Sequence, residues 1–65
     1  MSFRVLARQP KVGDEALVMD EIVLVVGIIP TRFGDIGQVV VQRNDGSEWQ
    51  LSTFEVDIEV IQYDT

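Results

Sequence analysis

The chain consists of short hydrophobic runs separated by turn-forming residues, a pattern typical of an all-β domain. It predicts a short strand within residues 3–8, followed by strands over residues 15–19, 22–29, 38–43, 47–52 and 57–61. Turns are expected at residues 20–21 and 52–55, a loop at 30–35, and fraying over 62–65. Helix is the alternative for residues 16–26, but the β-branched residues there, followed by Gly27 and Pro30, favour strand.

Residues 38–52 predict a tight hairpin whose register follows from burial. A two-residue turn would place Gln42 beside Trp49 on one face of the hairpin. A three-residue loop over 44–46, with Gly46 left-handed, separates apolar from polar side chains. It pairs Val41 with Trp49 and Val39 with Leu51. Because burial selects the register that segregates apolar side chains, we predict the three-residue loop.

Residues 22–29 form the longest apolar run, interrupted only by Gly27. Consecutive side chains of a strand point to opposite faces, so one face can enter the core while the other needs cover. Monomers seldom expose such an apolar face. We therefore expect a homo-oligomer, most simply a dimer, with an interface drawn from Ile22, Val23, Leu24, Val25, Val26 and Ile28. The alternative is that residues 1–7 fold over this outer face.

Composition limits the chemistry that the chain can support. Its 65 residues make one domain, 1–65, with neither cysteine nor histidine, so we expect no metal and no cofactor. Eleven acids against five bases give a net charge of −6, which makes nucleic acid an unfavourable partner. No apolar run approaches the ~20 residues of a membrane helix. Because cysteine is also lacking, we expect a soluble, cytoplasmic protein.

Three segments resemble parts of the SH3-like barrel. KVGDEALV (11–18) resembles its opening, where Gly-Asp precedes the first long strand. FGDIGQVVV (33–41) is similar to the glycine-x-x-glycine-x-valine turn of KOW-type modules in ribosomal proteins and transcription elongation factors. LSTFEVDIEVI (51–61) resembles the closing turn and strand. The resemblance implies an all-β fold, a small SH3-like barrel of about five strands.

Departures from these families bear on the partner. KOW modules carry lysines between the two glycines, where this chain has Asp35 and Ile36. Peptide-binding SH3 domains use an aromatic groove for proline-rich ligands, whereas Trp49 is followed here by Gln50. Neither an RNA-binding nor a proline-peptide role is therefore favoured.

Residues suited to catalysis are sparse. Catalysis needs a nucleophile or an acid–base pair in an enclosed pocket, and so small a barrel has little room for one, so we expect no enzyme. Two groups of acids stand out: Asp14, Glu15, Asp20 and Glu21, and then Glu55, Asp57 and Glu59. The first lacks the spacing of a calcium loop, and we interpret the second as the solvated face of an edge strand.

The loop before the glycine turn supplies the candidate partner-binding residues, Arg32, Phe33 and Asp35. Exposed loop residues bind more often than they pack. The alternative is that Phe33 folds back over the open end of the barrel while Arg32 pairs with an acid. We expect the other large aromatics, Trp49 and Phe54, to lie in the core.

These observations favour a small non-enzymatic binding or assembly module that acts through protein–protein contacts. One alternative is a KOW-like nucleic-acid-binding module whose bases cluster in space: Arg4, Arg8, Lys11, Arg32 and Arg43. Another is an acidic regulator that covers a basic surface of its partner.

Overall fold

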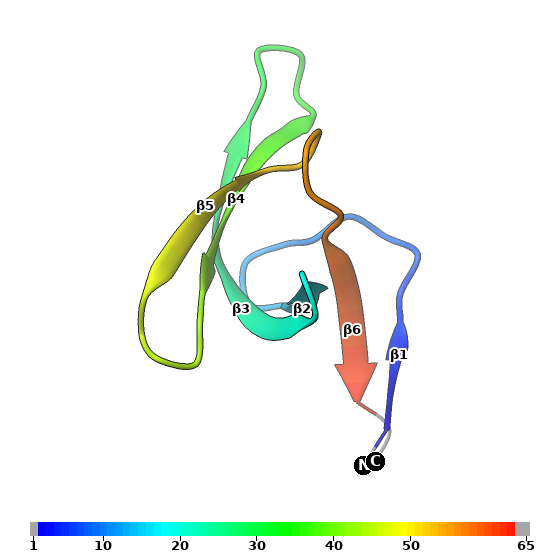
Figure 1. Ribbon diagram of the computed structural model, residues 1–65. Coiled ribbons are helices and arrows are strands. Elements are labelled where there is room, and N and C mark those ends of the chain that lie inside the picture. The colour runs from blue at the N-terminus through cyan, green and yellow to red at the C-terminus, as the bar shows by residue number, and fades with distance from the viewer. Residues whose placement is uncertain (1, 64–65) are drawn as a thin grey trace.

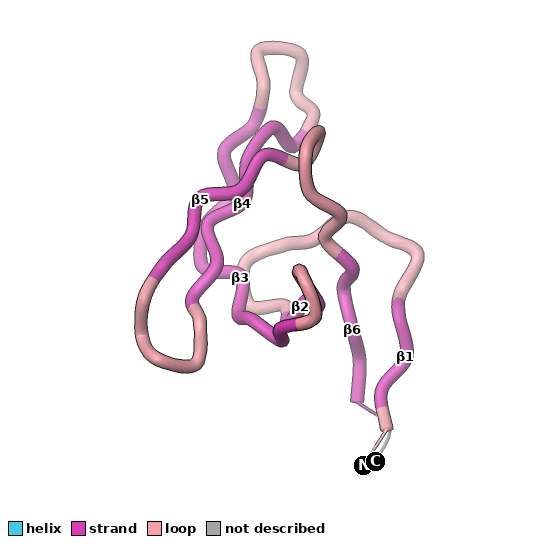
Figure 2. Tube along the Cα trace, viewed as in Figure 1, coloured by secondary structure: helices cyan, strands magenta, loops and turns pink. Residues whose placement is uncertain are grey.

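A computed structural model describes residues 2–63 as an all-β domain built on one six-stranded antiparallel sheet (Figures 1 and 2). The strands are β1 (Phe3–Val5), β2 (Glu15–Val18), β3 (Glu21–Pro30), β4 (Ile36–Gln42), β5 (Glu48–Ser52) and β6 (Glu59–Tyr63). Their order across the sheet is β1-β6-β2-β3-β4-β5. Within residues 2–63, no helix has the length and apolar character needed to cross a membrane.

The sheet curls strongly around its core (Figure 1) but does not close. Its edges are β1 and β5, and among the described residues no ladder joins these two strands. The prediction of an all-β fold is confirmed, whereas the sheet has six strands and open edges where a barrel of about five strands was expected.

The β4–β5 hairpin has the register derived from the sequence. Its ladder pairs Val39 with Leu51 and Val41 with Trp49, as predicted. The Arg43 N–H donates to the Ser47 carbonyl at 2.8 Å, and the Gly46 N–H donates back to the Arg43 carbonyl at 3.0 Å. Gly46 has φ 90°, in the left-handed region that a three-residue loop requires.

A β-bulge changes the face that β3 presents to the core. Val25 and Gly27 pair with successive residues of β4, so Val26 is the extra residue. Val23 and Val25 point inward before the bulge, and Ile28 packs on the core after it. Simple alternation along β3 therefore fails at its midpoint.

The core is formed by aliphatic side chains of β2, β3 and β4, and Val60 and Ile61 of β6 are also buried. Its buried cluster contains Ala16, Val18, Val23, Val25, Val39 and Val41. Half-buried hydrophobic residues pack around this cluster, among them Trp49, as its pairing with Val41 predicts. No charged or polar residue of the described chain is buried.

The turn between β2 and β3 lies one residue earlier than predicted. Val18 pairs with Glu21, so the two-residue turn is Met19–Asp20, where 20–21 was expected. Met19 has φ 49° and Asp20 has φ 65°. Two successive left-handed residues match the twist of a two-residue hairpin, but the geometry favours Asn and Gly at these positions. The apolar Met19 made the sequence look like a continuing strand.

The first and last strands also differ from their predicted bounds. β1 is shorter than predicted and covers only Phe3–Val5. β6 begins and ends two residues later than the predicted 57–61, because Gln62 and Tyr63 pair with β1. The expected fraying is therefore wrong for these two residues, and residues 64–65 lie outside the described chain.

Candidate functional site

The loop between β3 and β4 projects from the body of the sheet and carries the predicted binding residues (Figure 1). It is closed by the Thr31 N–H, which donates to the Asp35 carbonyl at 2.6 Å, and by the Gly34 N–H, which donates to the Thr31 carbonyl at 3.1 Å. Gly37, at the start of β4, allows Thr31 to pack closely, since a Cβ there would lie 2.9 Å from the Thr31 Cγ2. The loop therefore has a defined backbone geometry.

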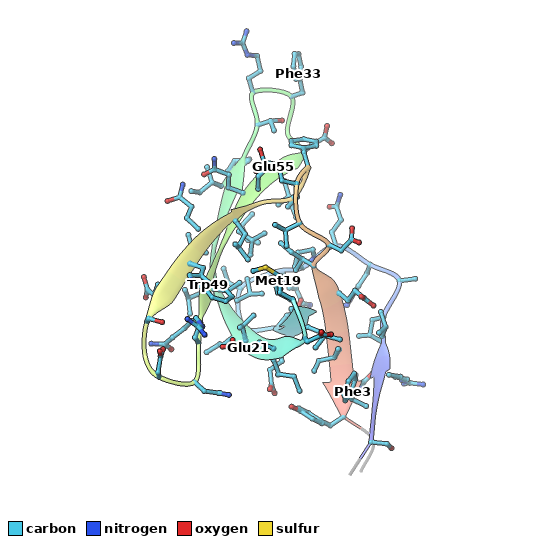
Figure 3. The ribbon with its side chains drawn as sticks, viewed as in Figure 1. Phe3, Met19, Glu21, Phe33, Trp49 and Glu55 are labelled. Atoms are coloured by element: carbon cyan, nitrogen blue, oxygen red, sulfur yellow. The ribbon has the colours of Figure 1, made fainter. Side chains whose placement is uncertain are left out.

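Phe33 lies at the tip of this loop and points into solvent (Figure 3), with 83% of its surface exposed. The alternative in which it folds back over the sheet is therefore wrong. The Arg32 guanidinium carbon lies 5.9 Å from the centre of the Phe33 ring, within the range of a cation–π contact. Both ion pairs between described residues use other bases, so Arg32 does not pair with an acid of residues 2–63. Asp35 is exposed at the same end.

Phe54 is also exposed, at 78%, so the prediction that it lies in the core is wrong. It belongs to the turn between β5 and β6, which is fastened to β4. The Thr53 hydroxyl donates to the Ile36 carbonyl at 2.7 Å, and the Thr53 N–H donates to the Gly37 carbonyl at 3.1 Å. These bonds fix the turn so that the side chain of Phe54 lies beside Ile29 and Pro30 at the end of β3.

Phe54 lines a shallow groove of about 310 Å³ together with Ile29 and Pro30 of β3. Both of these β3 residues are exposed, Ile29 by 41%. With Phe33 at the nearby tip, these side chains give one end of the molecule an apolar character. We call Ile29, Pro30, Phe33 and Phe54 the hairpin-end surface. Of these four residues, the sequence identified only Phe33 as a binding residue. The position of Phe54 depends on the hydrogen bond from the Thr53 hydroxyl to the Ile36 carbonyl, which joins residues far apart in the sequence.

A second groove lies at the Met19–Asp20 turn (Met19 is labelled in Figure 3). Leu17, Met19 and Val56 supply its apolar lining, and the other lining residues are Asp20, Glu55, Asp57 and Glu59. The interpretation of the last three acids as one face of an edge strand is wrong. Glu55 and Asp57 precede β6, and β6 lies between β1 and β2.

Two of the five basic residues, Arg8 and Arg43, form ion pairs with acids of the chain. Arg8 and Asp14 form a two-bonded ion pair at 2.7 and 2.9 Å, and this hydrogen bonding lowers the pKa of Asp14 to about 2. Arg43 bonds Glu21 at 2.9 and 3.0 Å, and its guanidinium carbon stacks 4.0 Å from the centre of the Trp49 ring. Both bases are thus held by acids of the same chain.

The predicted oligomer residues divide between the two faces of β3. Val23 and Val25 are 2% and 1% exposed, so they cannot form a contact surface, and Ile28 packs on the core. Leu24 is 40% exposed, whereas Ile22 and Val26 are half-buried. Residues 1–7 were the proposed alternative cover for β3, and of these residues 3–5 pair with β6.

Among residues 2–63, no group of three acids could hold a metal ion, and no buried side-chain nitrogen or oxygen lacks a hydrogen bond. Comparison with protein-family models, with curated proteins and with solved structures finds no match for this chain.

Proposed function

We propose that the chain is a non-enzymatic binding or assembly module that acts through protein–protein contacts, with the hairpin-end surface as its contact surface. The observation that carries this proposal is the exposure of Phe33 and Phe54, at 83% and 78%, on two separate loops at one end of the molecule. Exposed aromatic side chains that gather in this way are typical of interaction surfaces, where aromatic residues supply much of the binding energy.

The surroundings of these rings suit a protein partner. Arg32 and Asp35 place a positive and a negative charge beside the apolar side chains, so the surface combines an apolar centre with a polar rim. The loop backbone is fixed by its own hydrogen bonds, which reduces the entropy lost when a partner binds. We place this function in the cytoplasm, since the chain has no cysteine.

We also propose an SH3-like relationship for the fold. The strand order β6-β2-β3-β4-β5 supports it, as does the tight turn that precedes the last strand. In that turn the Ser52 carbonyl accepts bonds from the N–H groups of Glu55 and Val56. β1 is then an addition at the β6 edge.

A nucleic-acid-binding role is less well supported. Arg8 and Arg43 are neutralised by Asp14 and Glu21, and Arg32 lies on the projecting loop. The acidic net charge adds repulsion from phosphates.

Affinity capture from the source cell tests the proposal with three baits. The wild-type chain is compared with the double variant Phe33→Ser/Phe54→Ser and with Val12→Ser. Val12 is a matched control because it is 62% exposed and lies outside the hairpin-end surface. We expect the same protein to be captured by wild type and Val12→Ser and to be lost with the double variant. Equal capture by all three baits would refute the assigned surface.

A further inference from the structure

The groove at the Met19–Asp20 turn combines an apolar lining with a one-sided charge. Three of its seven lining residues are apolar, Leu17, Met19 and Val56, and all of the other four are acids. Met19 is 62% exposed and lines the groove together with the acids of the β5–β6 connection (Met19 and Glu55 are labelled in Figure 3). The apolar wall is therefore open to solvent and surrounded by negative charge.

The carboxylates of these four acids have no partner within the described chain. Asp20, Glu55, Asp57 and Glu59 are exposed, and none of their side chains takes part in a hydrogen bond or ion pair among residues 2–63. Asp14 and Glu21, in contrast, are each held by an arginine. Negative charge around the groove is thus uncompensated, and a positively charged partner would be attracted without breaking an internal contact.

We propose that this groove binds a basic segment of a protein partner, in which lysine or arginine side chains alternate with apolar ones. The long aliphatic stem of such a base would lie on Met19 and Val56 while its charged end meets the carboxylates. This site is separate from the hairpin-end surface, and the two proposals can fail independently.

Met19 lines the groove from a strained position in the turn. It has φ 49° at the first position of the two-residue turn, and its side chain is 62% exposed. Asn suits this conformation better than Met, because its short polar side chain tolerates the left-handed region. Replacing Met19 by Asn should therefore favour the turn while removing apolar surface from the groove.

Fluorescence anisotropy with a labelled peptide of alternating lysine and leucine tests the proposal. Two double variants carry the same net charge, −4 after removal of two acids from −6. Glu55→Gln/Asp57→Asn changes the groove, and Glu15→Gln/Glu48→Gln changes exposed acids outside both proposed sites. We expect the groove variant to bind about tenfold more weakly, as the loss of two exposed ion pairs implies, and the control to stay within about twofold of wild type.

Met19→Asn provides a second readout. We expect a higher midpoint of thermal unfolding together with about threefold weaker peptide binding, since part of one apolar contact is lost. A residue with only a structural role would not move the two quantities in opposite directions.

Three results would overturn the proposal. The first is no binding of the peptide to wild type up to millimolar concentration. The second is equal weakening in the two charge-matched variants, which would show attraction to the overall charge alone. The third is a homodimer that the peptide dissociates, because a second copy of this chain would then be the occupant of the groove.

Discussion

Replacing Gly46 by alanine should destabilise the protein through backbone conformation alone. Gly46 closes the β4–β5 loop with φ 90°, and no heavy atom beyond its two chain neighbours lies within 4 Å of the position that a Cβ would take. The new methyl group therefore meets no steric obstacle. The left-handed conformation costs an L-residue about 1–2 kcal/mol, and the less flexible unfolded chain returns about 0.4–1 kcal/mol. A net loss of about 1 kcal/mol follows.

Thermal and urea unfolding measure this loss directly. Because a domain of this size shifts by about 4–8 °C per kcal/mol, the midpoint should fall by about 4–8 °C. In urea the midpoint concentration should fall while the slope stays unchanged. Trp49 lies in β5 and reports the unfolding by its fluorescence.

Gly46→Asn is the matched control, because asparagine adds a larger side chain but tolerates the left-handed region. It should retain most of the stability that alanine loses. An alanine variant as stable as wild type would show that the three-residue loop is wrong. An asparagine variant as damaged as the alanine variant would show that crowding, rather than backbone conformation, sets the cost.

Three further predictions concern charge and association. Asp14 has a pKa lowered from 3.8 to about 2 by its bonds to Arg8, so its contribution to stability is present above the higher value and is lost as the pH falls through the lower one. Asp14→Asn should therefore lower the unfolding midpoint at neutral pH, and the difference from wild type should vanish below about pH 2 in a pH series of melting curves. Generic DNA and RNA should bind weakly at physiological salt in a filter or anisotropy assay, whereas tight binding with a steep salt dependence would favour the nucleic-acid alternative. Sedimentation equilibrium should detect a homodimer that Leu24→Lys dissociates without unfolding, and a wild-type monomer at high micromolar concentration would refute the dimer.

The β4–β5 hairpin could be predicted because local chemistry and burial agree there. Gly46 supplies the left-handed residue of the loop, and the pairing of Val41 with Trp49 keeps apolar side chains on one face. Each constraint acts within a short stretch of chain, so the sequence contains all the information that fixes the register.

Tertiary contacts overrode sequence patterns elsewhere. The bulge at Val26 depends on how β3 meets β4, and it reverses the face on which Ile28 lies. The turn at Met19 places methionine at a left-handed position where Asn or Gly is preferred. The residue type of Phe54 predicts burial, whereas its side chain is 78% exposed. It lies in a turn that is held to β4 by the hydrogen bond from the Thr53 hydroxyl to the Ile36 carbonyl.

The same contacts determine how much of the candidate site was visible in the sequence. Arg32 and Phe33 could be identified because they are adjacent in a loop between two predicted strands. Ile29 and Phe54 join the same end only after folding, since Phe54 lies 25 positions further along the chain. The hairpin-end surface is thus a product of the sheet's curvature as much as of its loop.

The most direct test of the proposed contact surface is site-specific photo-crosslinking in the source cell. The photoreactive analogue benzoylphenylalanine would replace Phe33, Phe54 or the control residue Val12, one at a time. All three positions are exposed by more than 60% in the folded chain, so the substitutions should leave the fold intact. We predict a covalent adduct with the same protein from positions 33 and 54 and none from position 12. Adducts of equal yield from all three positions, or none from 33 and 54, would contradict the account.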